Sequence, residues 1–120
     1  MNYKIIELNE KELKFRLKSK DSVEIEKITG KSLFDVIANL TMTNVIMLLK
    51  YMRKSEIDSF SDKNAYDLYD ELVDSGYTLE RIGYDIIFPT MVVSGFLTQE
   101  ELEDLVGTAR EKRKQTPEEQ

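Results

Sequence analysis

The segment that most constrains the fold is NVIMLLKYMRK, residues 44–54, which is apolar on almost every side until Lys50. Thr43 directly precedes it and predicts an N-cap, because a threonine hydroxyl can accept a hydrogen bond from an amide of the first turn. A helix with so little polar surface is typical of the centre of a bundle. The rest of the chain is therefore expected to supply elements that pack around it.

The first 18 residues predict a β-hairpin. Apolar and charged residues alternate from Leu13 to Lys18, which is the period of a strand with one wet face. The preceding segment YKIIEL is rich in β-branched residues, and residues 9–11 supply the turn. The basic side chains of the wet face are either a docking site for acidic groups or a solvated face paired in part with Glu7. These basic residues are Lys14, Arg16 and Lys18.

Short helices are predicted on both sides of Gly30, a residue typical of a helix stop. The segment DSVE, which begins at Asp21, resembles a capping box. The alternation in VEIE leaves a strand as the second interpretation of this segment. The segment SLFD, from Ser32, repeats the cap pattern and predicts an apolar helix that reaches Leu40.

The cleanest amphipathic helix is KNAYDLYDELVDSG, which begins at Ser61 or Asp62 and ends at Gly76. Its opposite face carries carboxylates that could attract calcium or magnesium, or that form an ordinary solvated face. A cation site needs oxygens that converge, whereas a straight helix points these side chains apart. The solvated face is therefore favoured. The carboxylates belong to Asp67, Asp70, Glu71 and Asp74.

Two further helices are predicted after this one. Thr78 begins a helix that Pro89 must kink or end, because proline lacks an amide donor. Thr98 begins the last helix, whose acidic start and basic end suit the helix dipole. The basic residues from Arg110 to Lys114 could contact nucleic acid, but dipole compensation explains them at less cost.

These elements predict an α+β fold that is mostly helical, with an N-terminal β-hairpin followed by a bundle of about five or six short helices. The length of 120 residues fits a single domain whose core needs no metal or disulfide. We expect that domain to span residues 1–113, with the hairpin in 1–18 and the bundle in 19–113. Residues 114–120 are expected to form a flexible tail.

Composition excludes several classes of function. The chain has no cysteine and no histidine, which excludes thiolate chemistry and removes the commonest general base and zinc ligand. A net charge of -6 disfavours sequence-independent binding to nucleic acid. The N-terminus does not resemble a signal peptide, and the most apolar run, IIFPTMVVSGFL, is shorter than the roughly 20 residues of a membrane span. No pair of carboxylates stands out for acid–base catalysis, and no glycine pattern indicates a cofactor, so we expect neither enzyme activity nor a cofactor.

The same apolar run, from Ile86 to Leu97, is the segment that most suggests a contact with a partner. It is too apolar for a simple connector, so it either packs in the core or forms an exposed patch, where methionine and phenylalanine offer adaptable contacts. The candidate partner-binding residues are Phe88, Met91, Val92, Phe96 and Leu97.

The order of the first elements matches a known pattern over residues 3–40. The hairpin turn reads Asn-Glu-Lys-Glu from Asn9, and the next helix ends in Glu26, Lys27 and Gly30 before the apolar segment LFDVIANL. This arrangement resembles the tail assembly chaperones of long-tailed bacteriophages, especially the siphophage type. That family commonly has an Asn-Gly-Lys-Glu-like turn and a Glu-Lys-x-x-Gly helix end, followed by a bundle of helices.

The resemblance implies a non-enzymatic role. Such chaperones bind the tape measure protein, a very long helical chain, and keep it soluble while the tail tube assembles. The implied location is the host cytoplasm, with the protein absent from the mature virion. The tail tube protein is a second expected partner and self-association a further expectation, whereas nucleic acid and membranes are not expected to bind.

Two other classes of function remain open. A small regulatory interaction module, such as an anti-repressor or adaptor, shares these features but predicts a defined one-to-one complex. A hydrolase that uses paired carboxylates would need a concave pocket with two converging acids.

Overall fold

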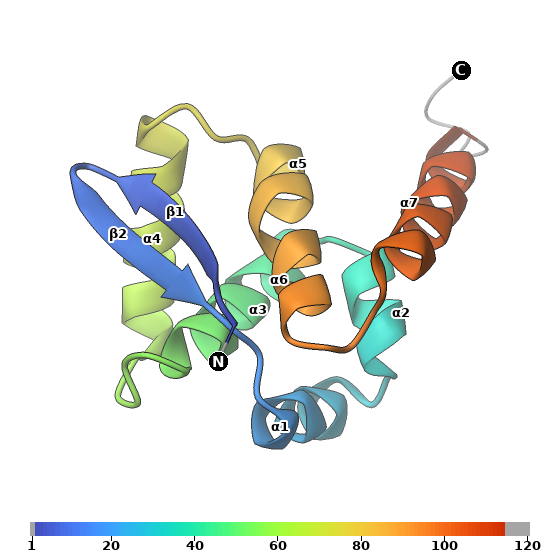
Figure 1. The fold of residues 1–120 in the computed structure, drawn as a ribbon, viewed down its shortest axis with the longest axis horizontal. Helices are drawn as coiled ribbons and strands as arrows, with labels where there is room; N and C mark the ends of the chain where they lie inside the picture. The colour runs from blue at the N-terminus through green and yellow to red at the C-terminus, as the bar shows by residue number, and fades with distance from the viewer. Residues whose placement is uncertain (1, 115–120) are drawn as a thin grey trace.

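A computed structural model describes residues 2–114, and the side chains of residues 2–107. An N-terminal hairpin lies against one side of a group of helices (Figure 1). The elements are β1 (Lys4–Leu8), β2 (Lys11–Phe15), α1 (Ser19–Thr29), α2 (Leu33–Ala38), α3 (Met42–Lys54), α4 (Asp62–Asp74), α5 (Leu79–Ile82), the π-helical turn η1 (Gly83–Ile87), α6 (Phe88–Val93) and α7 (Gln99–Lys114). Since α5, η1 and α6 follow one another without a break, the described chain holds six helices, and the predicted fold class is confirmed. The predicted tail, apart from Lys114 at the end of α7, lies outside the described residues.

The two strands pair antiparallel, with Leu8 opposite Lys11, so the loop between them has two residues. Asn9 and Glu10 both adopt positive φ, 52° and 65°, which is the backbone of a type I′ turn. The turn therefore forms without the glycine that usually favours it. Of the basic face, Arg16 donates a hydrogen bond to the carbonyl of Asn2, and Glu7 lies opposite Glu12 rather than a basic residue.

The first helix begins earlier than the capping pattern predicts. α1 starts at Ser19, so Asp21 lies within its first turn instead of capping it, and the alternative of a strand is wrong. Gly30 ends the helix as predicted, with φ 69° and its amide bonded to the carbonyl of Glu26. The cap at Ser32 is also confirmed, because its hydroxyl accepts a hydrogen bond from the Asp35 amide.

The apolar helix α3 is capped by Thr41, not Thr43. The Thr41 hydroxyl accepts a hydrogen bond from the Asn44 amide at 3.1 Å, and Thr43 lies inside the helix. One side of α3 is fully buried, as its composition predicts, and packs against α4, β2, η1 and α5. The buried side chains of this side include Val45, Leu48, Leu49 and Met52.

The chain stays helical through Pro89. A π-helical turn, η1, precedes the proline, and the Phe88 amide bonds to the Gly83 carbonyl five residues back. A π-helical turn accommodates a break in the regular hydrogen bonds between each amide and the carbonyl four residues earlier. The helix therefore continues to Val93 instead of ending. The buried Thr90 hydroxyl donates to the carbonyl of Ile86, which supports this turn.

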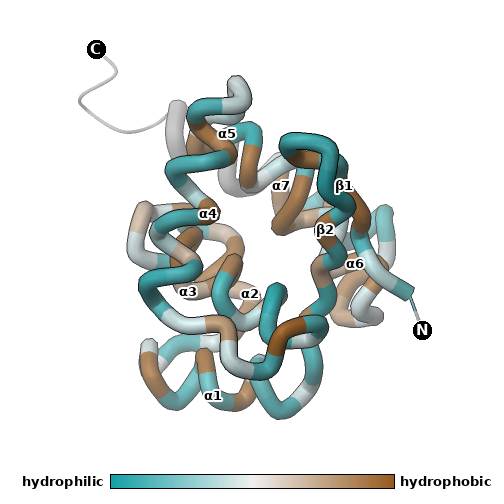
Figure 2. Tube along the Cα trace, turned by 90° about the vertical axis from the view of Figure 1, so that its left-hand side faces the viewer, coloured by the Kyte–Doolittle hydropathy of each residue, from teal (hydrophilic) through white to brown (hydrophobic). Residues whose placement is uncertain are grey.

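Buried residues from β1 to α7 form one hydrophobic cluster. Hydrophobic stretches are prominent on α3, while α4 is hydrophilic along much of its length (Figure 2). Two bonds join the hairpin to α3: the Arg16 amide donates to the Met52 carbonyl, and Arg53 donates to the Lys14 carbonyl. The hairpin thus covers one side of α3 and leaves another side to be considered below.

Ser61 is the N-cap of α4 and forms a capping box with Asn64. The Ser61 hydroxyl accepts a hydrogen bond from the Asn64 amide, and the Asn64 side chain accepts one from the Ser61 amide. Ser61→Ala is expected to lower the free energy of unfolding by about 1 kcal/mol, because the first turn of α4 loses a hydrogen-bond acceptor. Ser59→Ala, an exposed position in the preceding loop, is the control and should change stability by less than about 0.5 kcal/mol. Urea unfolding of both variants checks this; equal effects would mean that the cap contributes nothing.

Candidate functional site

The run predicted as a partner-binding patch lies mostly in the core. Phe88, Met91 and Leu97 expose 4%, 0% and 8% of their surface, so the core interpretation of the run is the one that their packing favours. Val92 and Phe96 are half-buried and pack against the same cluster. In the folded chain these side chains stabilise the body, and a surface for a partner must be sought elsewhere.

An uncovered apolar surface lies on the outer side of α3. Residues 43, 46, 47 and 50 share this side because they are three or four positions apart. Ile46 and Met47 are only half-buried, and Met42 exposes 47% of its surface. An apolar helix side of this kind normally has a neighbour that covers it.

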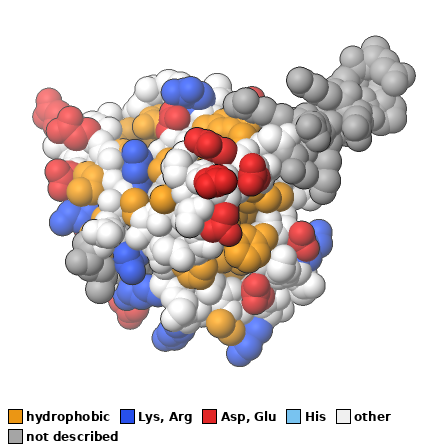
Figure 3. Space-filling view, turned by 45° about the vertical axis from the view of Figure 1, so that its right-hand side comes forward, with side chains coloured by type: hydrophobic (Ala, Val, Ile, Leu, Met, Phe, Trp, Pro, Cys, Tyr) orange, Lys and Arg blue, Asp and Glu red, His pale blue; other side chains and the backbone are white. Residues whose placement is uncertain are grey.

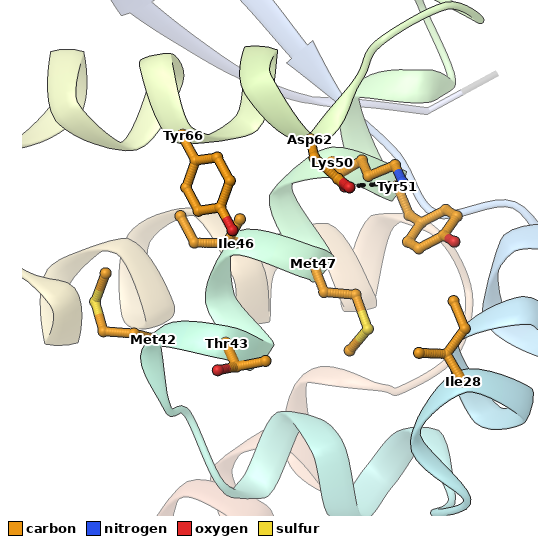
Figure 4. A pocket seen from close by; sticks show the side chains of 9 residues that line it. All are labelled: Ile28, Met42, Thr43, Ile46, Met47, Lys50, Tyr51, Asp62 and Tyr66. Carbon is orange, nitrogen blue, oxygen red and sulfur yellow. Dashed lines mark ion pairs between the residues drawn. The ribbon is translucent and has the colours of Figure 1, made fainter.

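Side chains from α4 and α1 turn this side of α3 into a groove of ≈ 380 Å³. Tyr66 of α4 and Ile28 of α1 are each 59% exposed, and Figure 4 shows them on either side of α3 with Met47 between. The volume lies within the range of protein binding pockets. We call it the α3 groove; it is lined by Ile28, Met42, Thr43, Ile46, Met47, Lys50, Tyr51, Asp62 and Tyr66.

One ion pair lies at the end of the α3 groove. Lys50 Nζ is 3.0 Å from Asp62 Oδ1, and the Lys50 ammonium also lies over the Tyr51 ring, 5.2 Å from its centroid. The hydrogen bond with Asp62 raises the pKa of Lys50, and the carboxylate of Glu24 acts in the same direction. Lys50 is therefore a fixed cation, and the lining as a whole carries no net charge.

The lining is suited to binding and offers little for catalysis. Its side chains are mostly apolar or aromatic, and two are methionines, whose flexible thioethers adapt to different contacts. Among the described side chains, no group of three or more acidic residues could hold a metal ion. Within the same part of the chain, every helix is too short or too polar to cross a bilayer. The groove is thus suited to the apolar stripe of an amphipathic helix.

A second hollow, of ≈ 400 Å³, lies between η1, α6 and the first half of α7. Its apolar walls include Phe88 and Leu102, which are already buried, so it offers less exposed apolar surface than the α3 groove. Figure 3 shows the side of the molecule that carries α7, where acidic side chains gather between hydrophobic patches. We therefore place the candidate site at the α3 groove.

Asp21 lines a hollow between α1 and α3, and most of the other side chains that line this hollow are charged. Burial raises the pKa of the Asp21 carboxyl above its ordinary 3.8, although the ammonium groups of Lys18 and Lys54 oppose the shift. Since the folded pKa lies above the unfolded one, the folded state binds the proton more tightly. The resulting stability is present at low pH and is lost as the pH rises through the folded pKa.

Asp21→Asn is therefore expected to be at least as stable as the wild type near pH 7, because it removes a buried charge. Its advantage should shrink as the pH falls from 7 through the raised pKa of the wild-type carboxyl, because that carboxyl then becomes protonated. Melting temperatures of both proteins across this range measure the effect. A variant that is less stable than the wild type near pH 7 would mean that attraction to Lys18 and Lys54 outweighs the cost of burial.

Sequence reasoning missed the α3 groove, although a signal for it existed. The all-round apolar pattern of residues 44–54 indicates that α3 needs covering on every side, and the described chain covers only part of it. Ile25 and Ile28 are only three residues apart, yet Ile25 is buried while Ile28 lines the groove. No protein-family model matches the chain, and no curated protein or solved structure shows significant similarity to it.

Proposed function

We propose that this protein is a tail assembly chaperone of long-tailed bacteriophages, which binds helical segments of the tape measure protein and keeps them soluble during assembly of the tail tube. The observation that carries the proposal is the uncovered apolar side of α3, with Ile46 and Met47 at its centre. The resemblance over residues 3–40 supports it, as do a hairpin and a Gly30 helix end at the expected places.

A single copy can shield only a short part of such a client. The α3 groove extends along α3 from Met42 to Tyr51, roughly 14 Å at 1.5 Å per residue, which matches between two and three turns of a bound helix. A long client helix with a continuous apolar stripe is prone to aggregate. We therefore expect many copies to bind weakly along one client, so that polymerising tube subunits can displace them.

Co-expression with a fragment of the tape measure protein tests the proposal. The soluble fraction of the fragment should rise in the presence of this chain, and native mass spectrometry should show several copies per client. A fragment that stays equally insoluble would contradict the proposal. One copy bound tightly to a single regulatory protein would instead favour the interaction module.

The proposal also places the protein in the host cytoplasm during assembly and outside the finished particle. Mass spectrometry of purified virions should detect the tape measure and tube proteins but not this chain. Its detection at stoichiometric levels in virions would contradict the assignment as an assembly factor. Pull-down of the tail tube protein would add the second expected partner.

A further inference from the structure

The exposed edge of α4 beside the α3 groove carries a row of carboxylates. Asp62, Tyr66, Asp70 and Asp74 follow one another at intervals of four residues and form a row that turns gradually around α4, so Asp70 lies nearer the groove side than Asp74. The first two line the groove, so Asp70 and Asp74 continue the same edge beyond it. We call these four residues the α4 row.

Among the described side chains, none forms an ion pair with the last two carboxylates of the α4 row. Asp70 and Asp74 are exposed, and neither forms an ion pair or a hydrogen bond with another described side chain. The other acidic side chains of α4 are engaged: Asp67 pairs with Lys63 at 2.7 Å, and Glu71 accepts a hydrogen bond from Asn9 at 2.6 Å. Asp70 and Asp74 are thus exposed carboxylates without an ion pair among the described side chains, while Glu71 keeps its negative charge because Asn9 is neutral.

The opposite wall of the groove differs in charge. Ile28 lines that wall, and in the sequence it lies between Lys27 and Lys31, both exposed. Glu24, one turn before Ile28, lies close enough to raise the pKa of Lys50. The two sides of the groove therefore differ: the α4 side continues beyond the groove into exposed carboxylates, and the α1 side carries charges of both signs.

We infer that the α3 groove selects an amphipathic helix whose apolar stripe is bordered by lysine or arginine on the edge that faces α4. This inference rests on the proposed function and adds the charge pattern of the client. The apolar stripe would lie on Ile46 and Met47, while its basic border would lie beside Asp70 and Asp74. A second copy of this chain, with a net charge of -6, lacks the positive charge that this edge favours.

The test uses two labelled helical peptides of about 18 residues, longer than the ~12–15 residues below which isolated helices are marginal. Both carry the same leucine and methionine stripe; one has lysine and the other glutamate on the flanks. Fluorescence anisotropy with the full chain should show the lysine peptide binding about fivefold to tenfold more tightly, and the difference should shrink in high salt.

The double variant Asp70→Lys and Asp74→Lys should abolish or reverse this preference. The control variant Glu10→Lys and Glu12→Lys makes the same change in net charge on the hairpin, which packs on the other side of α4 along Asn64, Asp67 and Leu68. The control should keep the preference. If both double variants weaken lysine-peptide binding equally, net charge alone explains it and the inference fails.

The remaining outcomes separate the inference from the proposed function. Equal affinity of the wild type for both peptides would overturn the charge selection, while rescue of the tape measure fragment would still support the chaperone. If neither peptide binds and the fragment stays insoluble, both fail. If the chain forms dimers as its concentration rises, and these dimers bind neither peptide, the groove would be assigned to a second copy. That result would also overturn the inference.

Discussion

Arg53→Ala should destabilise the protein by roughly 3 kcal/mol, the largest loss expected from a single charged side chain here. Arg53 is 5% exposed, and its guanidinium donates to the Lys14 carbonyl at 2.9 Å and to Glu56 Oε1 at 2.8 Å. It also lies over the rings of Phe15 and Phe60, at 5.7 and 5.6 Å from their centroids. Alanine would leave a cavity and remove the hydrogen-bond donor of the Lys14 carbonyl and of Glu56, so the hairpin and the 55–61 loop would each lose one of their contacts with α3.

Arg53→Lys should recover only part of this loss. A lysine ammonium lacks both the flat surface that a guanidinium places over the two rings and its fixed, planar set of N–H donors. Arg81→Ala is the matched control: it breaks an exposed (i, i+4) pair with Asp85 and should cost less than about 0.5 kcal/mol. Urea denaturation of the three variants provides the measurement. If Arg53→Ala and Arg81→Ala lose the same stability, Arg53 does not hold the hairpin to α3.

The double variant Met42→Asp and Tyr66→Asp should lower the affinity for a tape measure fragment at least about tenfold. Both side chains line the α3 groove, and both are already largely exposed, at 47% and 59%. The new carboxylates would have to lose their water when an apolar helix binds, and this cost weakens binding. Stability should change little, because neither side chain is part of the buried core.

The double variant Ile5→Asp and Phe34→Asp is the control for that experiment. These residues are exposed to a similar extent, 47% and 46%, but lie on β1 and α2 and do not line the α3 groove. It adds the same two charges and should bind the fragment within about twofold of the wild type. Pull-down and isothermal titration of both variants measure the difference, and equal losses would mean that charge repulsion, not the groove, reduces binding.

Local sequence signals predicted most of the elements, because caps and glycine stops act within one turn. Ser32, Ser61, Thr78 and Thr98 each accept the expected hydrogen bond at a helix start. The two wrong caps have a common cause: at Asp21 and Thr43 a suitable side chain lay within the first turn of a helix that starts earlier. Of the two outcomes predicted at Pro89, a kink or an end, the helix does not end: it continues to Val93 after an adjacent π-helical turn, which has no clear local signature.

The candidate site was harder to predict than the fold. Composition alone does not tell an apolar segment that packs inside from one that faces a partner, and the run from Ile86 to Leu97 is largely buried. The groove depends on which side of α3 is left open after α4 and β2 have packed, and this is a tertiary property. The apolar run from Val45 to Leu49 on α3 was the informative signal, because the described part of the chain buries only one side of that helix.

Mapping of the contact surface by NMR tests the central claim most directly. A ¹⁵N-labelled sample titrated with a helical fragment of the tape measure protein should show the largest amide shifts in α3 from Met42 to Tyr51, around Tyr66 in α4 and near Ile28 in α1. Shifts confined to α7 and the hairpin, or no shifts at concentrations where the fragment is kept soluble, would contradict binding in the α3 groove.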